Sequence, residues 1–193
     1  MLNETFSVIF KHRATVIFVF SRYATEHASR INRIIKQRGG HALLVGVGGS
    51  GRQSLAKLAT YIANYELFQI EVNKTYGIQS WRNDLKKVLK MAGADCKNVV
   101  FLFTDLQIKD EAFLEDISMV LNTGEVPNLF ATDEKTEIME RIQAHAQEQG
   151  RDVAGGEASF ANLYGIFLNN VKRNLHIILC MSPIGNGFRN RLR

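Results

Sequence analysis

The stretch that decides the fold of this 193-residue chain runs Gly46-Val47-Gly48-Gly49-Ser50-Gly51-Arg52-Gln53-Ser54. Small and apolar residues at 42–45 lead into it and predict a strand, while the residues from Ser54 to about Tyr65 predict a helix. A glycine loop between a strand and a helix can direct several backbone N–H groups at a phosphate, and the helix N-terminus adds partial positive charge. Gly46 and Gly51 have the spacing of the phosphate-binding pattern Gly-x-x-x-x-Gly-Lys-Ser/Thr.

Two positions of this loop depart from the pattern. Arg52 stands where the lysine is expected, and Gln53 stands where the magnesium-binding hydroxyl is expected; Ser54 comes one residue late. Arginine still pairs with phosphate oxygens, but as a planar fork rather than a compact charge. An amide carbonyl is a poor ligand for Mg²⁺. The loop therefore predicts nucleotide binding with impaired hydrolysis, and the alternative is a glycine turn that only joins the strand to the helix.

Asp105 is the second candidate site residue. It follows five consecutive apolar residues at 99–103, which predict a strand buried on both faces of a parallel sheet. In phosphate-loop ATPases such a strand ends in an acidic residue that holds Mg²⁺. A neighbouring glutamate usually polarises the attacking water, but here the neighbours are Thr104 and Leu106, so either register leaves the site one carboxylate short. The alternative is that Asp105 only caps the next turn.

The remaining pattern predicts an α/β fold. A strand is expected at 67–72, and the lysines at 86, 87 and 90 are expected to form a solvated helix face. Ser80 and Asp133 are expected to cap helices, and Gly150 with the glycines at 155–156 to open a flexible stretch. The other predicted helices cover 22–37, 80–91, 111–121, 134–149 and 160–171, and a further buried strand covers 176–181.

Composition narrows the function classes. The chain is 46% hydrophobic with a net charge of +5, and its basic residues are not interleaved with aromatic ones, which disfavours nucleic-acid binding. The two cysteines have no metal-type spacing, and Cys180 lies in an apolar run that predicts a small buried hydrophobe. No segment approaches the ~20 apolar residues of a membrane span, and 14–20 is interpreted as a strand or packing segment.

Several strings, taken in order, identify a family. Together with the glycine loop they resemble the fourth AAA+ module of axonemal dynein heavy chains over about residues 20–193. The strings are Arg30-Ile31-Asn32-Arg33-Ile34, Gly40-His41-Ala42-Leu43-Leu44-Val45, Phe101-Leu102-Phe103-Thr104-Asp105, Phe113-Leu114-Glu115-Asp116-Ile117, Gly124-Glu125-Val126-Pro127-Asn128-Leu129-Phe130 and Leu179-Cys180-Met181-Ser182-Pro183.

The resemblance implies an AAA+ P-loop fold, a three-layer αβα sandwich with a mostly parallel central sheet. On this basis residues 21–193 are expected to form a partial large subdomain, and residues 1–20 an unplaced N-terminal segment. The chain is expected to stop before the fifth strand, the helical lid and the stalk. The missing strand would leave one sheet edge exposed and prone to aggregation.

The resemblance also implies a function and partners. It implies part of a ring-shaped motor that moves on microtubules in the axoneme of cilia and flagella, with the neighbouring modules and dynein subunits as partners. Microtubules would be reached only through the stalk, and neither nucleic acid nor membrane is an expected partner. Residues 48–53 would hold ATP or ADP through backbone amides, Arg52 would neutralise phosphate, and Asp105 would position Mg²⁺ or water. Catalytically active and purely structural modules are the alternatives.

Further site residues follow from the resemblance alone. Ser182 is at the sensor position, where asparagine is usual. Arg189, Arg191 and Arg193 lie near the place from which a module can offer an arginine to its neighbour's nucleotide.

Overall fold

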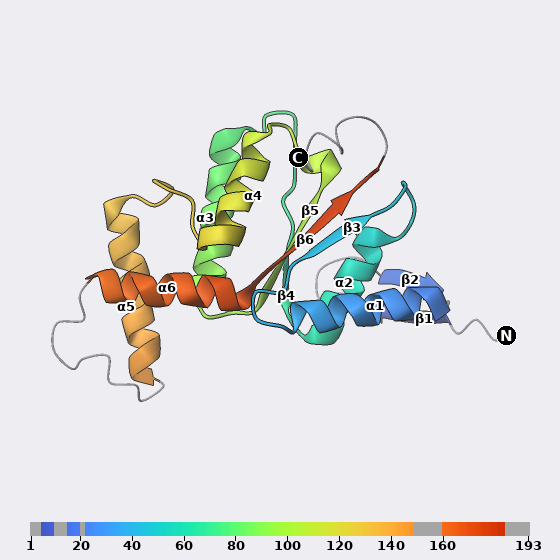
Figure 1. The fold of residues 1–193 in the computed structure, drawn as a ribbon, viewed down its shortest axis with the longest axis horizontal. Helices are drawn as coiled ribbons and strands as arrows, with labels where there is room; N and C mark the ends of the chain where they lie inside the picture. The colour runs from blue at the N-terminus through green and yellow to red at the C-terminus, as the bar shows by residue number, and fades with distance from the viewer. Residues whose placement is uncertain (1–4, 10–14, 20–21, 149–159, 184–193) are drawn as a thin grey trace.

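A computed structural model describes residues 5–9, 15–19, 22–148 and 160–183. The described residues form six strands and six α-helices, and four of the strands make a central sheet (Figure 1). In order they are β1 Thr5–Ile9, β2 Thr15–Val19, α1 Arg22–Ile35, β3 Ala42–Val45, α2 Arg52–Ala63, β4 Glu66–Phe68, α3 Ile78–Gly93, β5 Val99–Thr104, the short 3₁₀ helix η1 Asp105–Gln107, α4 Ala112–Thr123, α5 Thr132–Glu148, α6 Phe160–Asn174 and β6 Leu175–Met181.

The central sheet has four parallel strands in the order β3-β6-β5-β4. Val45 pairs with Met181, and Thr104 pairs with Cys180, so β3, β6 and β5 end at nearly the same level. Because parallel strands end at one edge of a sheet, the glycine loop after β3 and Asp105 after β5 share that edge. The predicted parallel α/β fold is confirmed.

Helices cover both faces of this sheet. All six residues of β5 are buried, and their side chains alternate between the faces. Val99, Phe101 and Phe103 pack with α3, α4 and α6, whereas Val100 and Leu102 pack with α1 and α2. Figure 1 shows the same division, which makes the predicted three-layer αβα arrangement.

The apolar stripe predicted for α3 forms the centre of the larger core. Trp81 is fully buried, and its ring stacks on that of Phe113 with the centroids 4.6 Å apart. The indole N–H donates to the Asp116 carboxylate over 2.8 Å, which gives this buried acidic group a partner. The two helices α3 and α4 are thereby fixed against one face of the sheet.

Two predicted helix caps are wrong. The helix α3 begins at Ile78 after an extended Gly77, so Ser80 lies inside its first turn. The helix α5 begins at Thr132, which places Asp133 inside the helix as well. There the Glu134 carboxylate accepts from the Ala131 amide over 3.0 Å and satisfies one of the N–H groups at the start of the helix.

The predicted solvated lysine face of α3 is only partly correct. Lys86 and Lys90 are partly buried against α5, where they pair with Glu134 at 2.6 Å and Glu137 at 3.0 Å. Only Lys87 is exposed as predicted. The periodicity of α3 showed which residues face away from the sheet, but not that a second helix covers them.

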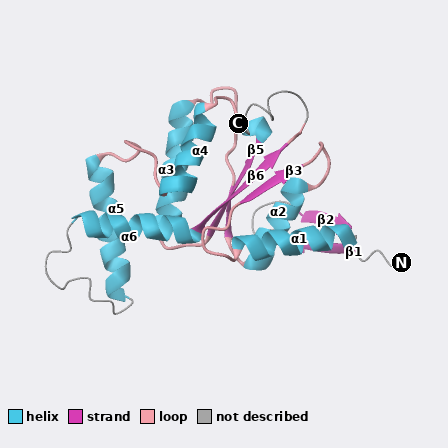
Figure 2. Ribbon diagram, in the orientation of Figure 1, coloured by secondary structure: helices cyan, strands magenta, loops and turns pink. Residues whose placement is uncertain are grey.

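The strand predicted at 67–72 is shorter than expected. The strand β4 comprises only Glu66–Phe68, and Figure 2 draws the chain that leads on to α3 as loop. Beyond it, the carbonyl of Ile70 accepts a hydrogen bond from the Gln107 side chain at 2.7 Å. This contact joins the segment after β4 to the turn that follows β5.

A separate hairpin precedes α1. The strands β1 and β2 pair antiparallel, from Thr5 opposite Val19 to Ile9 opposite Thr15, which confirms a strand within 14–20. The flexible stretch predicted around Gly150 and residues 155–156 lies outside the described residues. Within the described ranges, no helix combines the length and apolarity needed to cross a membrane.

Two histidines join the starts of β3 and β6. The Ile177 amide donates to His41 Nδ1 over 3.0 Å, and His176 Nδ1 lies 3.0 Å from the Gly40 carbonyl oxygen. Burial, followed by the nearby His176, lowers the pKa of His41. Burial also lowers the pKa of His176. Both imidazoles therefore favour the neutral form in the folded chain.

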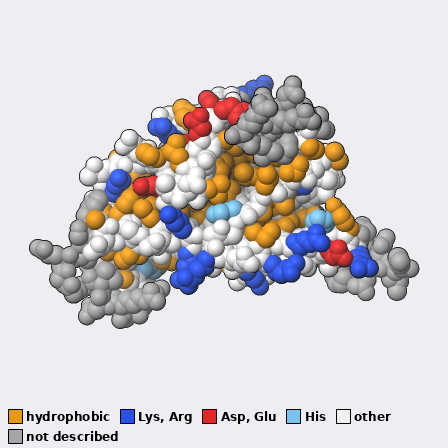
Figure 3. All heavy atoms as spheres, viewed as in Figure 1, with side chains coloured by type: hydrophobic (Ala, Val, Ile, Leu, Met, Phe, Trp, Pro, Cys, Tyr) orange, Lys and Arg blue, Asp and Glu red, His pale blue; other side chains and the backbone are white. Residues whose placement is uncertain are grey.

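The outer strand β3 is an open edge in the described part of the sheet. Leu43 is 45% exposed and Val45 is 46% exposed. Figure 3 shows hydrophobic side chains over the part of this face where β3 runs, and basic ones along the margin where α1 runs. Exposed apolar side chains on an outer strand are a surface on which a further strand or element can pack.

Candidate functional site

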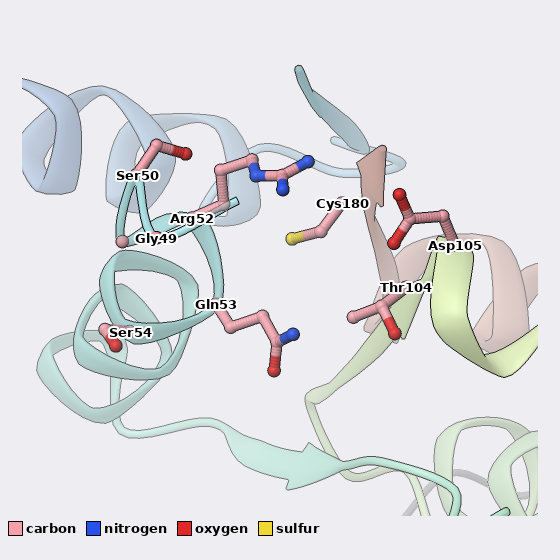
Figure 4. Close-up of a pocket in the computed structure, with 9 residues that line it drawn as sticks. Gly49, Ser50, Arg52, Gln53, Ser54, Thr104, Asp105 and Cys180 are labelled. Carbon is pink, nitrogen blue, oxygen red and sulfur yellow. The ribbon is translucent and has the colours of Figure 1, made fainter. Parts of the chain in front are cut away.

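A cavity of about 310 Å³ lies at the carboxyl edge of the sheet (Figure 4). One wall comes from the glycine loop and the first turn of α2, and the other from the ends of β5 and β6. The lining residues are Gly49, Ser50, Gly51, Arg52, Gln53, Ser54, Thr104, Asp105 and Cys180. The structure thus brings the two predicted clusters, the loop and Asp105, to one cavity.

The shape of the loop depends on glycine. Gly49 and Gly51 have φ values of 77° and 76°, in the left-handed region that side chains disfavour. The first hydrogen bond of α2 runs from the Leu55 amide to the Gly51 carbonyl, over 2.8 Å. The amides of residues 52–54 precede that bond, so the helix offers them no acceptor. These N–H groups lie at the cavity wall, where they suit an anion.

The first part of the loop lies outside the cavity lining. Gly46, Val47 and Gly48 precede the lining residues, and the Gly46 amide donates to the Met181 carbonyl over 3.2 Å. A β-carbon on Gly46 would lie 2.8 Å from the Ser50 hydroxyl oxygen. Gly46 therefore allows the loop to fold back closely on itself beside β6.

Arg52 holds the loop to the end of β6. One guanidinium nitrogen donates to the Met181 carbonyl, and the other donates to the Val47 carbonyl over 3.3 Å. The side chain still lines the cavity, with its guanidinium between the loop and β6 (Figure 4). Its side chain thus lines the cavity, while its hydrogen bonds are made to the backbone.

The next two side chains of α2 differ in direction. Figure 4 shows Gln53 extending from α2 toward Thr104, and Ser54 on the opposite side of the helix turn. Of Gln53 and Ser54, therefore, only Gln53 directs its side chain toward the end of β5. Since an amide oxygen is a weaker Mg²⁺ ligand than a carboxylate or hydroxyl at a conventional site, the loop contributes little to a metal position.

Asp105 joins the ends of β5 and β6. One carboxylate oxygen accepts from the Leu106 amide at 3.0 Å, as a turn cap would. The other accepts from the Ser182 amide at 2.8 Å. Leu106 is 84% exposed and supplies no acidic group beside Asp105. Ser182, at the expected sensor position, thus contacts the acidic residue through its backbone.

Gln107 is a positioning residue that the sequence interpretation missed. Its side-chain oxygen accepts from the amide of Thr104 at 2.8 Å and from the Thr104 hydroxyl at 3.1 Å. Its side-chain nitrogen donates to Ile70, so one buried amide fixes the end of β5 against the segment after β4. The signal was present, because Thr104 and Gln107 have the three-residue spacing of a capping box.

Cys180 forms part of the cavity wall from β6. It is 2% exposed, which confirms the prediction of a buried residue. Burial raises the pKa of its thiol to about 11, so the group is protonated at neutral pH. Among the described residues, no group of three or more histidine, cysteine or acidic side chains could hold a metal ion. Arg189, Arg191 and Arg193 lie outside the described residues.

Comparison with known proteins gives one consistent result. A family model described as "P-loop containing dynein motor region D4" matches residues 16–193. The chain is 52% identical to human dynein axonemal heavy chain 3 over 181 residues, which is 94% of the chain. It is 50% identical to human dynein axonemal heavy chain 1 over 170 residues, or 88% of the chain. In each case it spans about 4% of the relative's length.

Proposed function

Since this chain belongs to the family of the P-loop containing dynein motor region D4, we propose that it is a nucleotide-binding regulatory module of an axonemal dynein heavy chain. In this proposal residues 21–193 form part of the large subdomain of this module, and hydrolysis at its site is weak or absent. The observation that supports the proposal most directly is the cavity shared by the glycine loop, the start of α2 and Asp105.

The backbone supplies most of the phosphate binding in this proposal. The amides of residues 52–54 precede the first hydrogen bond of α2, and Gly49 and Gly51 give the loop its turn. Charged oxygen acceptors bind such amides more strongly than neutral ones do. The polyphosphate of ADP or ATP is therefore the ligand chemistry that fits this wall, with Arg52 adding positive charge.

Weak hydrolysis follows from the composition of the opposite wall. Among the described residues that line the cavity, Asp105 is the only acidic one, and both of its carboxylate oxygens already accept backbone amides. Asp105 would hold Mg²⁺, through water, and the ion would neutralise phosphate charge. Leu106 cannot polarise an attacking water. The module thus retains groups for binding and lacks one that conventional hydrolysis needs.

A module of this kind acts through its neighbours. The relatives are named as axonemal dynein heavy chains. We place this chain in a ring of AAA+ modules within a microtubule-based motor of the ciliary or flagellar axoneme. Nucleotide binding would stabilise one arrangement of the domain and so change its contacts with adjacent modules, which is coupling between sites rather than turnover.

Two measurements test this function. Calorimetry with ADP and with ATP should show one site per chain, and no heat at millimolar nucleotide would favour a purely structural module. Phosphate release assignable to this site in the whole heavy chain should be undetectable, both in wild type and in Asp105→Ala. Turnover that is assigned to this site in wild type and lost in Asp105→Ala, with nucleotide still bound, would show instead that the site is an active ATPase.

A further inference from the structure

The peptide group between Met181 and Ser182 lies between the two walls of the cavity. Its carbonyl oxygen accepts from the Arg52 guanidinium and from the Gly46 amide, the latter at 3.2 Å. Its N–H group, which belongs to Ser182, donates to the Asp105 carboxylate at 2.8 Å. A peptide group is planar and rigid. One rigid unit is therefore bonded to the phosphate loop at one end and to the acidic residue at the other.

Arg52 is the side-chain donor to this peptide group, and a bound ligand can compete for it. Its two guanidinium nitrogens donate to the carbonyls of Val47 and Met181, which are neutral acceptors. A phosphate oxygen is a stronger acceptor for a guanidinium than a neutral carbonyl is. Because Arg52 also lines the cavity, a phosphate bound there competes with the Met181 carbonyl for the same donor.

The loss of that donor has a consequence for Asp105. Hydrogen bonds in a chain polarise one another, so a donor at the carbonyl strengthens the N–H of the same peptide group. Removing Arg52 from Met181 weakens the bond from Ser182 to Asp105. The carboxylate oxygen that Ser182 holds then becomes more available to a cation or a water in the cavity.

We propose that Arg52 and the Met181–Ser182 peptide group form a relay that couples phosphate occupancy of the loop to the state of Asp105. Arg52 is a positioning residue in this relay, and the sensor position acts through the backbone N–H of Ser182 rather than through its hydroxyl. The inference deepens the proposed function and, for its nucleotide response, rests on it.

The amide resonance of Ser182 in ¹⁵N-labelled protein reports on the relay directly. Arg52→Ala without nucleotide should move the Ser182 amide proton upfield, because alanine has no donor for the Met181 carbonyl. Metal-free ADP should move the wild-type Ser182 resonance in the same direction, and ADP should cause little further shift in Arg52→Ala. Asp105→Ala gives the reference position of the Ser182 resonance when its hydrogen bond to Asp105 is absent. Ser182→Ala, which keeps the N–H, should retain the response to ADP.

The nucleotide-free and ADP experiments distinguish failure of the relay from failure of the proposed nucleotide site. An unmoved Ser182 resonance in nucleotide-free Arg52→Ala would overturn the relay, whether or not ADP binds. The same holds if ADP moves the amides of residues 52–54 in wild type while Ser182 stays in place. If ADP at millimolar concentration moves none of those loop amides, the nucleotide site is wrong, and the nucleotide-free comparison still decides whether Arg52 controls Ser182.

Discussion

Replacing Gly51 by alanine tests how the loop directs its amides. Gly51 has φ of 76°, and a β-carbon there would meet no atom within 4 Å, so the cost is conformational rather than a clash. A left-handed conformation costs an L-residue about 1–2 kcal/mol. If the free loop relaxes, this strain reappears on binding and weakens ADP affinity by roughly 5- to 30-fold. If it cannot relax, the free energy of unfolding falls by that amount instead.

The assay therefore measures both quantities. Calorimetry gives the dissociation constant of ADP, and denaturant unfolding gives the free energy of unfolding. The loss of binding free energy and the loss of unfolding free energy should together be about 1–2 kcal/mol. Gly48→Ala is the matched control, since it also adds a β-carbon in open space but has no φ in the left-handed region. Equal affinity and equal stability in the two variants would refute the argument that the positive φ at Gly51 shapes the site.

Three other changes test the packing and the titrating groups. Gly93→Ala would place a β-carbon 2.3 Å from the Phe167 ring of α6, so we expect the free energy of unfolding to fall by about 1–3 kcal/mol in a denaturant titration. The control Gly165→Ala adds a β-carbon in open space and should not be destabilising. Trp81→Phe removes the donor to the buried Asp116 carboxylate and should cost about 1–3 kcal/mol, whereas unchanged unfolding would contradict that role. The pKa of His41 is lowered from 6.5, so the unfolded chain binds the proton more readily and stability should fall as the pH drops below that value. His41→Asn, which cannot titrate, should show a shallower decline, and an identical pH profile would count against this reasoning.

Much of the fold was predictable because apolar periodicity reports burial. Residues 99–103 were expected to be buried on both faces, and the structure buries all of β5. The limits of β4 were not predictable, since the strand ends where the Gln107 side chain, distant in sequence, bonds to Ile70. The roles of Lys86 and Lys90 were missed for a similar reason: their partners lie on α5, far along the chain.

The sequence predicted where the candidate site lies, but not which hydrogen bonds connect its residues. Glycine spacing located the loop, and an apolar run located Asp105, because both features are local in sequence. The sequence showed that Arg52 replaces lysine, but not that its fork bonds to Val47 and Met181. Those bonds need β6 beside β3, which is a property of strand order. The backbone bond from Ser182 to Asp105 depends on the same order.

The central claim is that backbone amides around α2 hold a polyphosphate in the cavity at the sheet edge. A structure of the protein with saturating ADP tests it most directly. We expect the β-phosphate within hydrogen-bonding distance of the amides of residues 52–54, with Asp105 on the opposite wall. A collapsed or empty cavity at saturating nucleotide, or ADP bound elsewhere on the chain, would contradict the account.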